Sequence, residues 1–158
     1  MSYDIIYGVH FFECKNLFYN NFIPMGLKKP NTMKKIISTD KAPQAIGPYS
    51  QAVEANNTLY ISGQIAINPE TGKLIEGTIK EQTELVLKNI GAILEAAGYT
   101  YSDVVKSTCL LSDMNNFSAM NEVYASIYPT DPPARAAYQV VKLPLGALIE
   151  IETIAIKF

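Results

Sequence analysis

The sequence predicts an α+β sandwich of ferredoxin-like character for residues 33–158, in which a mixed sheet carries two helices on one face. Three observations support this fold class. Short β-leaning runs bounded by Gly, Pro and Asn recur along these residues, two longer segments have helical periodicity, and the order of the elements is β-β-β-α-β-α-β-β. Two helices leave the other face of such a sheet to be covered by a further partner.

The first three strands are expected over residues 34–38, 49–55 and 58–66. A loop rich in proline and glycine separates the first two runs. Between the second and third runs, Asn56-Asn57 is a signal for a hairpin turn. A turn over residues 68–72 ends the third run.

Both helices have recognisable end signals. Thr78-Ile79-Lys80-Glu81 fits a capping box, and Gly98 lies where a C-terminal cap belongs, so the first helix is expected between them. The second helix is expected to begin near Asn115 or Asn116 and to end at Tyr128-Pro129. Each segment has apolar residues at helical spacing, which indicates one buried face.

The remaining strands are expected over residues 104–112, 134–142 and 148–156. We predict that the last two form a hairpin through a turn around Pro144 and Gly146. Apolar residues occupy both sides of the final strand, which a sheet with one solvent-exposed face would not need. The sequence therefore predicts a homo-oligomer in which sheets pack together.

Residues 1–32 differ in character from the rest of the chain. Phenylalanine and tyrosine are mixed with asparagine there, without a sustained helical or strand period. Met33 followed by Lys34-Lys35-Ile36-Ile37 would make a natural start. We therefore interpret residues 1–32 as a leader or extension outside the core domain. An ordered arm whose aromatic side chains pack on a neighbour is the alternative.

Composition limits the classes of function. The chain has 158 residues, of which 48% are hydrophobic, which suits one domain with its own core. A net charge of −2 provides no basic field for nucleic acid or for an anionic membrane. The sequence has neither a long apolar run nor a signal-peptide pattern. We expect a cytoplasmic protein whose partner is a small molecule.

Cysteine and histidine chemistry is also restricted. Cys14 and Cys109 are far apart and form no C-x-x-C pair, which is typical of a reducing compartment and predicts neither a redox motif nor a metal site. His10 is the only histidine and lies outside the predicted domain, so that domain has none for a catalytic triad or a Cys-His pair. Proton transfer there must use a carboxylate, a tyrosine, a lysine or bound water.

Arg135 is the only arginine in the chain and lies in a predicted strand. A guanidinium can hold a carboxylate through two parallel hydrogen bonds, which lysine does less well. Glu150 and Glu152 interrupt an apolar strand, and the predicted hairpin would place Arg135 on the same face as both glutamates. The residues alone fit either a carboxylate-binding site or a structural salt bridge.

Two further segments give weaker signals. Ser62-Gly63-Gln64 ends a strand, and a glycine there often marks the close approach of a ligand or of another backbone. Tyr49, after Gly47-Pro48, suits a ring held at the entrance of a strand. An ordinary packed tyrosine is the favoured interpretation of that residue.

Five short motifs follow one another along the chain. They are Ala45-Ile46-Gly47-Pro48-Tyr49, Tyr60-Ile61-Ser62-Gly63-Gln64, Pro133-Ala134-Arg135, Leu143-Pro144 and Ile149-Glu150-Ile151-Glu152. Together they resemble the RidA (reactive intermediate deaminase) family over residues 33–158, and residues 1–32 are unmatched. The resemblance implies a chorismate-mutase-like fold assembled as a homotrimer, with sites in the clefts between subunits. It also implies hydrolysis of 2-imino or enamine acids, such as 2-aminoacrylate and 2-iminopropanoate, to 2-oxo acids and ammonia.

The resemblance implies roles for individual residues by position. Arg135 matches the family's arginine for the substrate carboxylate, and Glu150 matches the glutamate that holds the attacking water. The positions that match other pocket residues are Tyr49, Ser62, Gly63 and Asn121. The family often has cysteine two residues after the arginine, where this chain has Ala137, whose main-chain groups remain available. No cofactor and no metal are implied, because a protonated imine carbon is already electrophilic.

Other functions use the same residues differently. The alternative is a non-catalytic trimer that binds or senses a small keto acid or amino acid through Arg135. A chorismate mutase is disfavoured, because a dianionic substrate and its developing oxyanion call for several cations. A nuclease or RNA-binding function, sometimes attached to this family, would need a basic stripe or an aromatic platform that the sequence lacks.

Overall fold

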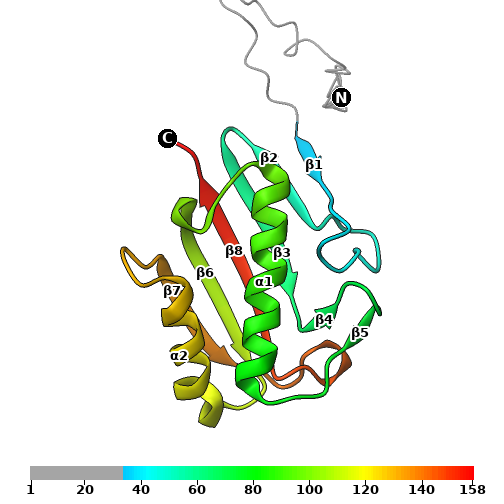
Figure 1. Cartoon of the computed structure of the whole chain (residues 1–158), viewed down its shortest axis with the longest axis vertical. Helices are drawn as coiled ribbons and strands as arrows, with labels where there is room; N and C mark the ends of the chain where they lie inside the picture. The colour runs from blue at the N-terminus through cyan, green and yellow to red at the C-terminus, as the bar shows by residue number, and fades with distance from the viewer. Residues whose placement is uncertain (1–33) are drawn as a thin grey trace, which may run out of the picture. The chain divides into compact units, whose positions relative to one another are not determined.

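The computed structural model describes residues 34–158, so the interpretations of residues 1–32, His10, Cys14 and Met33 lie outside the described residues. The described chain forms a six-stranded mixed sheet, a separate two-stranded sheet and two α-helices (Figure 1). No helix among these residues is long and apolar enough to span a membrane.

The six strands lie in the spatial order β1-β2-β3-β8-β6-β7, and only β6 and β7 are parallel neighbours. The strands of this sheet are β1 (Lys35–Ile37), β2 (Ala52–Ala55), β3 (Thr58–Gln64), β6 (Val104–Leu111), β7 (Ala134–Gln139) and β8 (Ile149–Ile156). The small sheet pairs β4 (Ile67–Asn68) with β5 (Lys73–Leu74), and the helices are α1 (Ile79–Ala97) and α2 (Phe117–Ile127). Short 3₁₀ turns cover Tyr101–Asp103, Met114–Asn116 and Pro144–Gly146.

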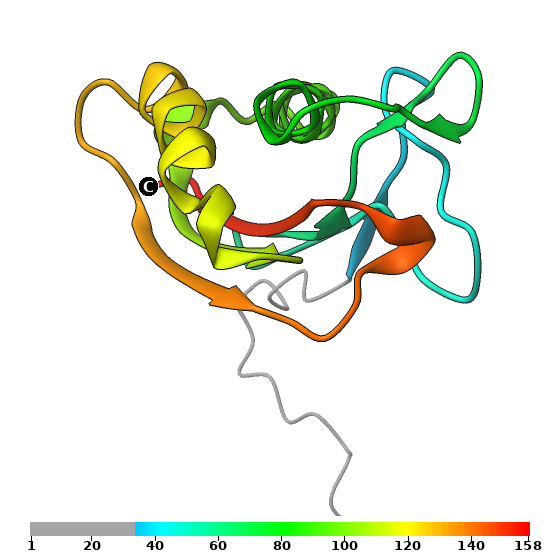
Figure 2. The same cartoon turned by 90° about the horizontal axis from the view of Figure 1, so that it is seen from below.

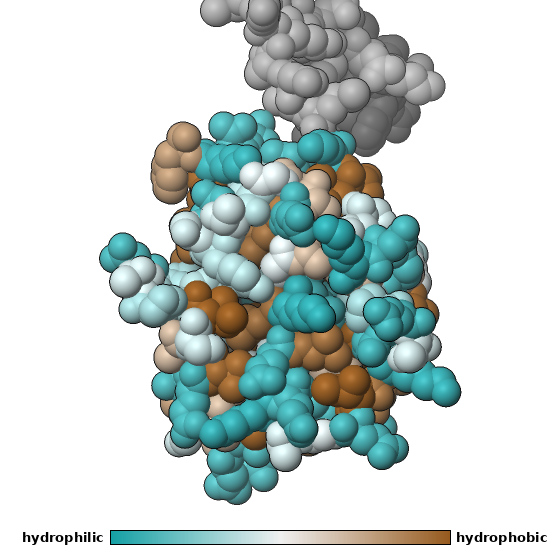
Figure 3. Space-filling model, viewed as in Figure 1, coloured by the Kyte–Doolittle hydropathy of each residue, from teal (hydrophilic) through white to brown (hydrophobic). Residues whose placement is uncertain are grey.

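Both helices cover the same face of the large sheet (Figure 2), which confirms the predicted α+β architecture. The core lies between the helices and this face. Among its fully buried side chains are Leu87 and Ile90 from α1, Met120 from α2 and Ile149 and Ile151 from β8. Polar side chains are spread over the outer surface of the helices, with scattered apolar ones between them (Figure 3).

Helix α1 begins and ends as the sequence predicts. The Thr78 side chain accepts from the backbone N–H of Glu81, and the Glu81 carboxylate accepts from the backbone N–H of Thr78 at 2.7 Å, which completes the capping box. Gly98 ends the helix with a φ of 78°, a left-handed conformation that glycine adopts without steric cost. The hairpin turn is confirmed too, since Asn56 and Asn57 have φ values of 51° and 59°.

Two local features differ from the prediction for residues 58–66. Strand β3 ends at Gln64, and a bulge interrupts its pairing with β8, because Ile61 pairs with Thr153 but Gln64 pairs with Ile151. The small β4–β5 hairpin follows and was not predicted. Its strands have two residues each, which is too short for an alternating pattern to show.

The predicted hairpin between the last two strands is wrong. Strand β7 pairs in parallel with β6, and β8 crosses to the middle of the sheet, where it pairs with β3 and β6. The physical reason is twofold. Helix α2 connects β6 to β7, and a helical connection is the usual route between parallel neighbours. A strand with apolar residues on both sides belongs in the interior of a sheet, which is the position that β8 occupies.

The sheet face opposite the helices carries exposed apolar side chains. Ile36 on β1, Tyr60 on β3 and Tyr138 on β7 have relative exposures of 52%, 50% and 58%. Their strands span the width of the sheet from one edge to the other. Half-exposed apolar side chains on the uncovered face of a sheet are positions that a further partner could cover.

Candidate active site

A cleft of about 650 Å³ opens at one end of β3 and β8. The loop between β1 and β2 supplies Tyr49, the bulge of β3 supplies Ser62 and Gly63, and β8 supplies Glu150 and Glu152. Ile46 and Leu145 add apolar side chains to the wall. Tyr49, Ser62, Gly63, Glu150 and Glu152 are candidates from the sequence, whereas the sequence does not indicate Ile46 and Leu145 as parts of a site.

The Glu150 side chain lies directly against the backbone of Gly63. A Cβ atom placed on Gly63 would be 1.9 Å from Oε1 of Glu150, 2.8 Å from its Cδ and 3.1 Å from its Cγ. Only glycine leaves room for the carboxylate in this position. The Ser62-Gly63-Gln64 motif indicates the close approach of a ligand or of another backbone, and the group that lies against Gly63 in the structure is instead a side chain, the carboxylate of Glu150.

The electrostatic surroundings of Glu150 favour its neutral form. Burial raises the pKa of this carboxyl above its ordinary value of 4.5, and the nearby Glu152 carboxylate raises it further. A carboxylate with a raised pKa is a better proton acceptor than an ordinary one. The cleft therefore contains a group suited to act as a general base.

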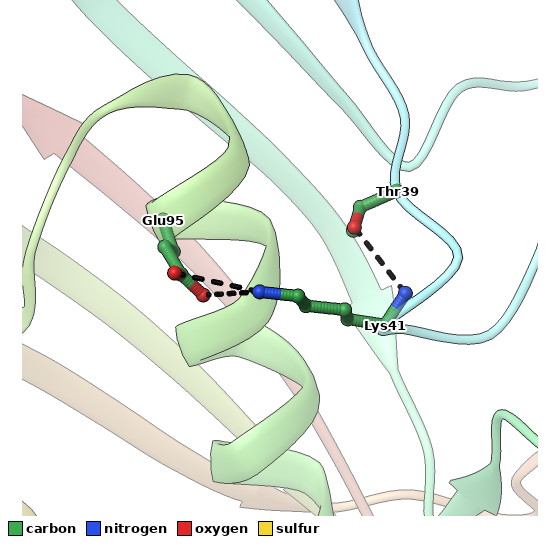
Figure 4. Close-up of polar contacts among 3 residues, drawn as sticks. All are labelled: Thr39, Lys41 and Glu95. Carbon is green, nitrogen blue, oxygen red and sulfur yellow. Dashed lines mark hydrogen bonds and ion pairs between the residues drawn. The ribbon is translucent and has the colours of Figure 1, made fainter.

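The loop that carries Tyr49 is held by one buried amide. Gln51 is only 3% exposed, its Oε1 accepts from the backbone N–H of Thr39 at 2.7 Å, and its Nε2 donates to the carbonyl of Pro43 at 2.7 Å. The ion pair between Lys41 and Glu95, 3.3 Å apart, also joins this loop to α1 (Figure 4), but both of its side chains are exposed. An exposed pair contributes little, so the Gln51 side chain is the main anchor.

Tyr49 lies in a tight turn at the wall of the cleft. Its backbone N–H donates to the carbonyl of Gly47 at 2.9 Å, and its hydroxyl accepts from the backbone N–H of Ile46 at 3.3 Å. Gly47 has a φ of 129°, which suits glycine. Tyr49 is 51% exposed, so the favoured interpretation as an ordinary packed tyrosine is wrong within one copy of the chain.

The hydroxyl of Ser62 has a backbone partner. Its Oγ donates to the carbonyl of Ser50 at 2.7 Å, and its backbone N–H donates to the carbonyl of Gln51 at 3.0 Å. These bonds join the bulge of β3 to the two residues just before β2. Ser62 thus fixes the shape of the cleft wall beside Glu150.

Arg135 lies in a second cavity of about 310 Å³, between β7 and α2. Its Nη2 donates to Oδ1 of Asn121 at 2.6 Å, and its Cζ lies 4.5 Å from the ring centroid of Tyr124 and 5.6 Å from that of Phe117. Ala137, two residues further along β7, is half-buried on the same face of the sheet. Asn121 is expected from the family resemblance, whereas the contact of the two rings with Arg135 is not expected from the sequence.

The expected convergence of Arg135 with Glu150 and Glu152 in one chain is wrong. Arg135 pairs with Ser107, which pairs with the buried Thr153, so the arginine lies on the helix-covered face. Glu150 and Glu152 alternate with Thr153 along β8 and therefore lie on the opposite face. This arrangement also excludes a salt bridge between Arg135 and either glutamate within one chain.

The structure thus divides the candidate residues into two groups. Tyr49, Ser62, Gly63 and Glu150 line one cleft, whereas Asn121 and Arg135 line the other cavity. No single cavity of one chain therefore contains all the candidate residues.

Cysteine and metal chemistry add no further candidate among the described residues. Cys109 is fully buried, and burial raises its pKa to about 11 although the nearby Arg135 lowers it, which disfavours the reactive thiolate. Within residues 34–158, no three His, Cys, Asp or Glu side chains form a cluster that could hold a metal ion.

A six-stranded mixed sheet with two helices on one face, and with a cleft at the end of β3 and β8, defines an α+β protein with the chorismate-mutase-like fold. The chain belongs to the RidA family. The family model that matches it is described as Endoribonuclease L-PSP and covers residues 39–157.

Named relatives support the same assignment. Reactive Intermediate Deaminase A, chloroplastic, from Arabidopsis thaliana is 49% identical over 85% of this chain and 72% of its own length. The 2-iminobutanoate/2-iminopropanoate deaminase of Homo sapiens is 52% identical over 79% of this chain and 91% of its own length. Among solved structures, YyfA of the conserved Rid protein family from Yersinia pestis is 51% identical, with a TM-score of 0.77 over 79% of this chain and 100% of that chain.

Proposed function

We propose that this protein is an imine deaminase that hydrolyses reactive 2-imino and enamine acids to 2-oxo acids and ammonia. The names of the Arabidopsis and human relatives support this reaction class. One structural observation carries the proposal, which is the Glu150 carboxylate with a raised pKa, held against Gly63 in the wall of a cleft. The substrate class is that of small acids related to 2-aminoacrylate and 2-iminopropanoate.

We propose further that the active site is composite, with Glu150 from one subunit and Arg135 from its neighbour. These side chains lie on opposite faces of the sheet, so one chain cannot direct both at one small substrate. The exposed apolar face with Ile36, Tyr60 and Tyr138 supplies a surface on which copies can pack. A homotrimer would form three such sites, one at each interface.

In this site the substrate carboxylate binds Arg135. The guanidinium has five N–H donors. One of them donates to Asn121, so the others remain to hold a carboxylate. The main-chain groups of Ala137 lie two residues further along the same strand. From the neighbouring subunit, Tyr49 and Ser62 would then enclose the imine beside Glu150.

Hydrolysis needs only water and a proton acceptor. Water attacks C2 of the protonated imine while the Glu150 carboxylate takes a proton from that water, and a carbinolamine forms. The proton then moves from Glu150 to the amino group, the C2–N bond breaks with its electron pair leaving on ammonia, and the C2 hydroxyl gives its proton to the Glu150 carboxylate as C2 becomes the carbonyl carbon. Ammonia takes that proton and leaves as ammonium, which restores the carboxylate. Fixing the substrate carboxylate aligns C2 with the water. No redox change occurs, so no cofactor takes part in these steps.

The partners follow from the same proposal. The protein acts on a small molecule and assembles with copies of itself, and neither nucleic acid nor a membrane takes part. The two carboxylates in the cleft would repel a phosphate backbone, which argues against a nuclease. We propose the cytoplasm as its location, with residues 33–158 as the functional domain and residues 1–32 as an extension.

Turnover distinguishes the enzyme from the alternative, a trimer that only binds or senses a keto acid or amino acid. The experiment adds the purified protein to a pyridoxal enzyme that releases 2-iminopropanoate from serine, and it follows pyruvate formation with and without a metal chelator. The proposal predicts faster pyruvate formation that does not depend on the chelator. Unchanged rates with several imines, together with retained pyruvate binding, would favour the sensor.

A further inference from the structure

Helix α2 presents three residues to the guanidinium of Arg135. Phe117, Asn121 and Tyr124 are spaced four and three residues apart, so they lie along one face of the helix. Asn121 accepts a hydrogen bond at the edge of the guanidinium. The Tyr124 ring lies closer than the Phe117 ring, with its centroid 4.5 Å from Cζ of Arg135 rather than 5.6 Å.

We propose that Tyr124 is a positioning residue, whose ring holds the Arg135 guanidinium in the orientation that binds the substrate carboxylate. This inference rests on the proposed function, because it assumes that Arg135 binds the substrate. Tyr124 itself does not act on the imine. Its contribution is to keep a long, flexible cationic side chain in one conformation before the substrate arrives.

The position of Arg135 explains why a ring is needed. The carboxylates of Glu150 and Glu152 lie across the sheet, so neither holds the guanidinium from within the chain. A single hydrogen bond to Asn121 fixes one nitrogen but leaves rotation about that contact. An aromatic face attracts the cation through its quadrupole, and this attraction is stronger where water is excluded. Tyr124 is 4% exposed, so its ring provides such a surface.

The Tyr124 ring packs directly on one neighbouring tyrosine, Tyr128. Its centroid lies 4.7 Å from that of Tyr128, and the Tyr128 ring meets Tyr101 edge to face with centroids 5.8 Å apart. Buried in this cluster, the Tyr124 hydroxyl has no hydrogen-bond partner among residues 34–158. The aromatic face, rather than the hydroxyl, is therefore the part of Tyr124 that contacts Arg135.

Three substitutions separate the ring from the hydroxyl and from general stability. Tyr124→Phe keeps the ring and should lose much less kcat/KM than Tyr124→Leu. Tyr124→Leu removes the ring and should lower kcat/KM about tenfold, mainly through KM. Tyr101→Leu removes a ring from the same cluster without touching Arg135, so it should lower the melting temperature and leave KM unchanged. Pyruvate affinity should follow KM in all three variants.

A second measurement does not depend on catalysis. Arg135 is the only arginine, so its Nε–Hε group gives a single side-chain signal in a ¹⁵N-correlated NMR spectrum. That signal should be shifted by the ring current of Tyr124 and should show restricted motion. Tyr124→Leu should move it toward the position of a free arginine and increase its mobility, whereas Tyr101→Leu should not.

Should Tyr124→Leu fail to fold, phenylalanine with one, two or three fluorine atoms at position 124 keeps the shape and weakens the quadrupole stepwise. KM should then rise with each fluorine. An unchanged KM across this series, or equal losses in Tyr124→Phe and Tyr124→Leu, would overturn the role of the ring. The protein could show no imine turnover while its Arg135 signal still depends on Tyr124. That result would contradict the proposed function but would support the positioning of Arg135 by Tyr124.

Discussion

Replacing Gly63 by alanine tests the placement of the Glu150 carboxylate. The new Cβ would lie 1.9 Å from Oε1 of Glu150, whereas ordinary contact begins at 3.4 Å, so the oxygen must retreat by about 1.5 Å. The clash is with the end of a flexible side chain, and a rotation of that side chain relieves it. The carboxylate therefore moves, while the backbone of β3 keeps its conformation.

This displacement should be costly for catalysis and cheap for stability. A misplacement of about 1 Å in a reacting group can lower the rate about a hundredfold, so we expect kcat of Gly63→Ala to fall by about that factor. Alanine in a strand is favoured over glycine by roughly 0.5–1 kcal/mol, which offsets part of the strain of moving Glu150. The melting temperature should therefore change little.

The assay compares pyruvate formation from freshly released 2-iminopropanoate with thermal unfolding of the same samples. Gly77→Ala is the matched control, because its Cβ would meet another carboxylate, Oε2 of Glu81, at 2.9 Å. Glu81 belongs to the capping box of α1 and lies outside the cleft, so this control should lose about 1 kcal/mol of stability and keep its activity. A Gly63→Ala protein with the parent kcat would refute the placement of the base.

Three further predictions concern the ionisable residues. Glu150→Gln should bind pyruvate like the parent in calorimetry but turn over about a hundredfold or more slowly, since the amide cannot accept the proton; parallel loss of binding would mark a structural role. Arg135→Lys should lose roughly tenfold or more in kcat/KM with a nearly unchanged melting temperature, because one of two charge-assisted hydrogen bonds is lost; a lower melting temperature with full activity would contradict this. Because the pKa of Glu150 is raised, kcat/KM should rise with pH through a midpoint above 4.5, and Glu152→Gln should lower that midpoint. The folded state binds the Glu150 proton more tightly than the unfolded state does. The contribution of Glu150 to the free energy of unfolding therefore falls as pH rises through the same range. An identical midpoint in both proteins would contradict the influence of Glu152.

Local signals predicted most of the fold. The capping box at Thr78, the glycine cap at Gly98 and the Asn56-Asn57 turn act within a few residues, and each appears where the sequence places it. The order of the strands in space depends on longer connections. The helix between β6 and β7 indicates that these two strands are parallel neighbours. The proline turn after β7 favours a hairpin of β7 with β8 instead, and this signal is misleading.

The site was only partly predictable for the same reason. The residue types at Arg135 and Glu150 indicated carboxylate chemistry, but the pairing of their strands decides which face each side chain occupies. The wrong pairing placed both on one face, and the actual pairing separates them. The helical spacing of Phe117, Asn121 and Tyr124 could have revealed them as a group. The contact of Glu150 with Gly63 depends on a bulge in β3, and that bulge can be located only once the pairing of β3 with β8 is known.

Subunit complementation tests the central claim, a site shared between Glu150 of one subunit and Arg135 of the next. Arg135→Ala and Glu150→Gln should each be inactive as pure assemblies. After co-expression in equal amounts, with mixed assemblies verified by mass spectrometry, about a quarter of the sites should combine an intact arginine with an intact glutamate by random mixing. We predict imine turnover at about a quarter of the parent rate. Mixed assemblies as inactive as the two separate variants would contradict the composite site.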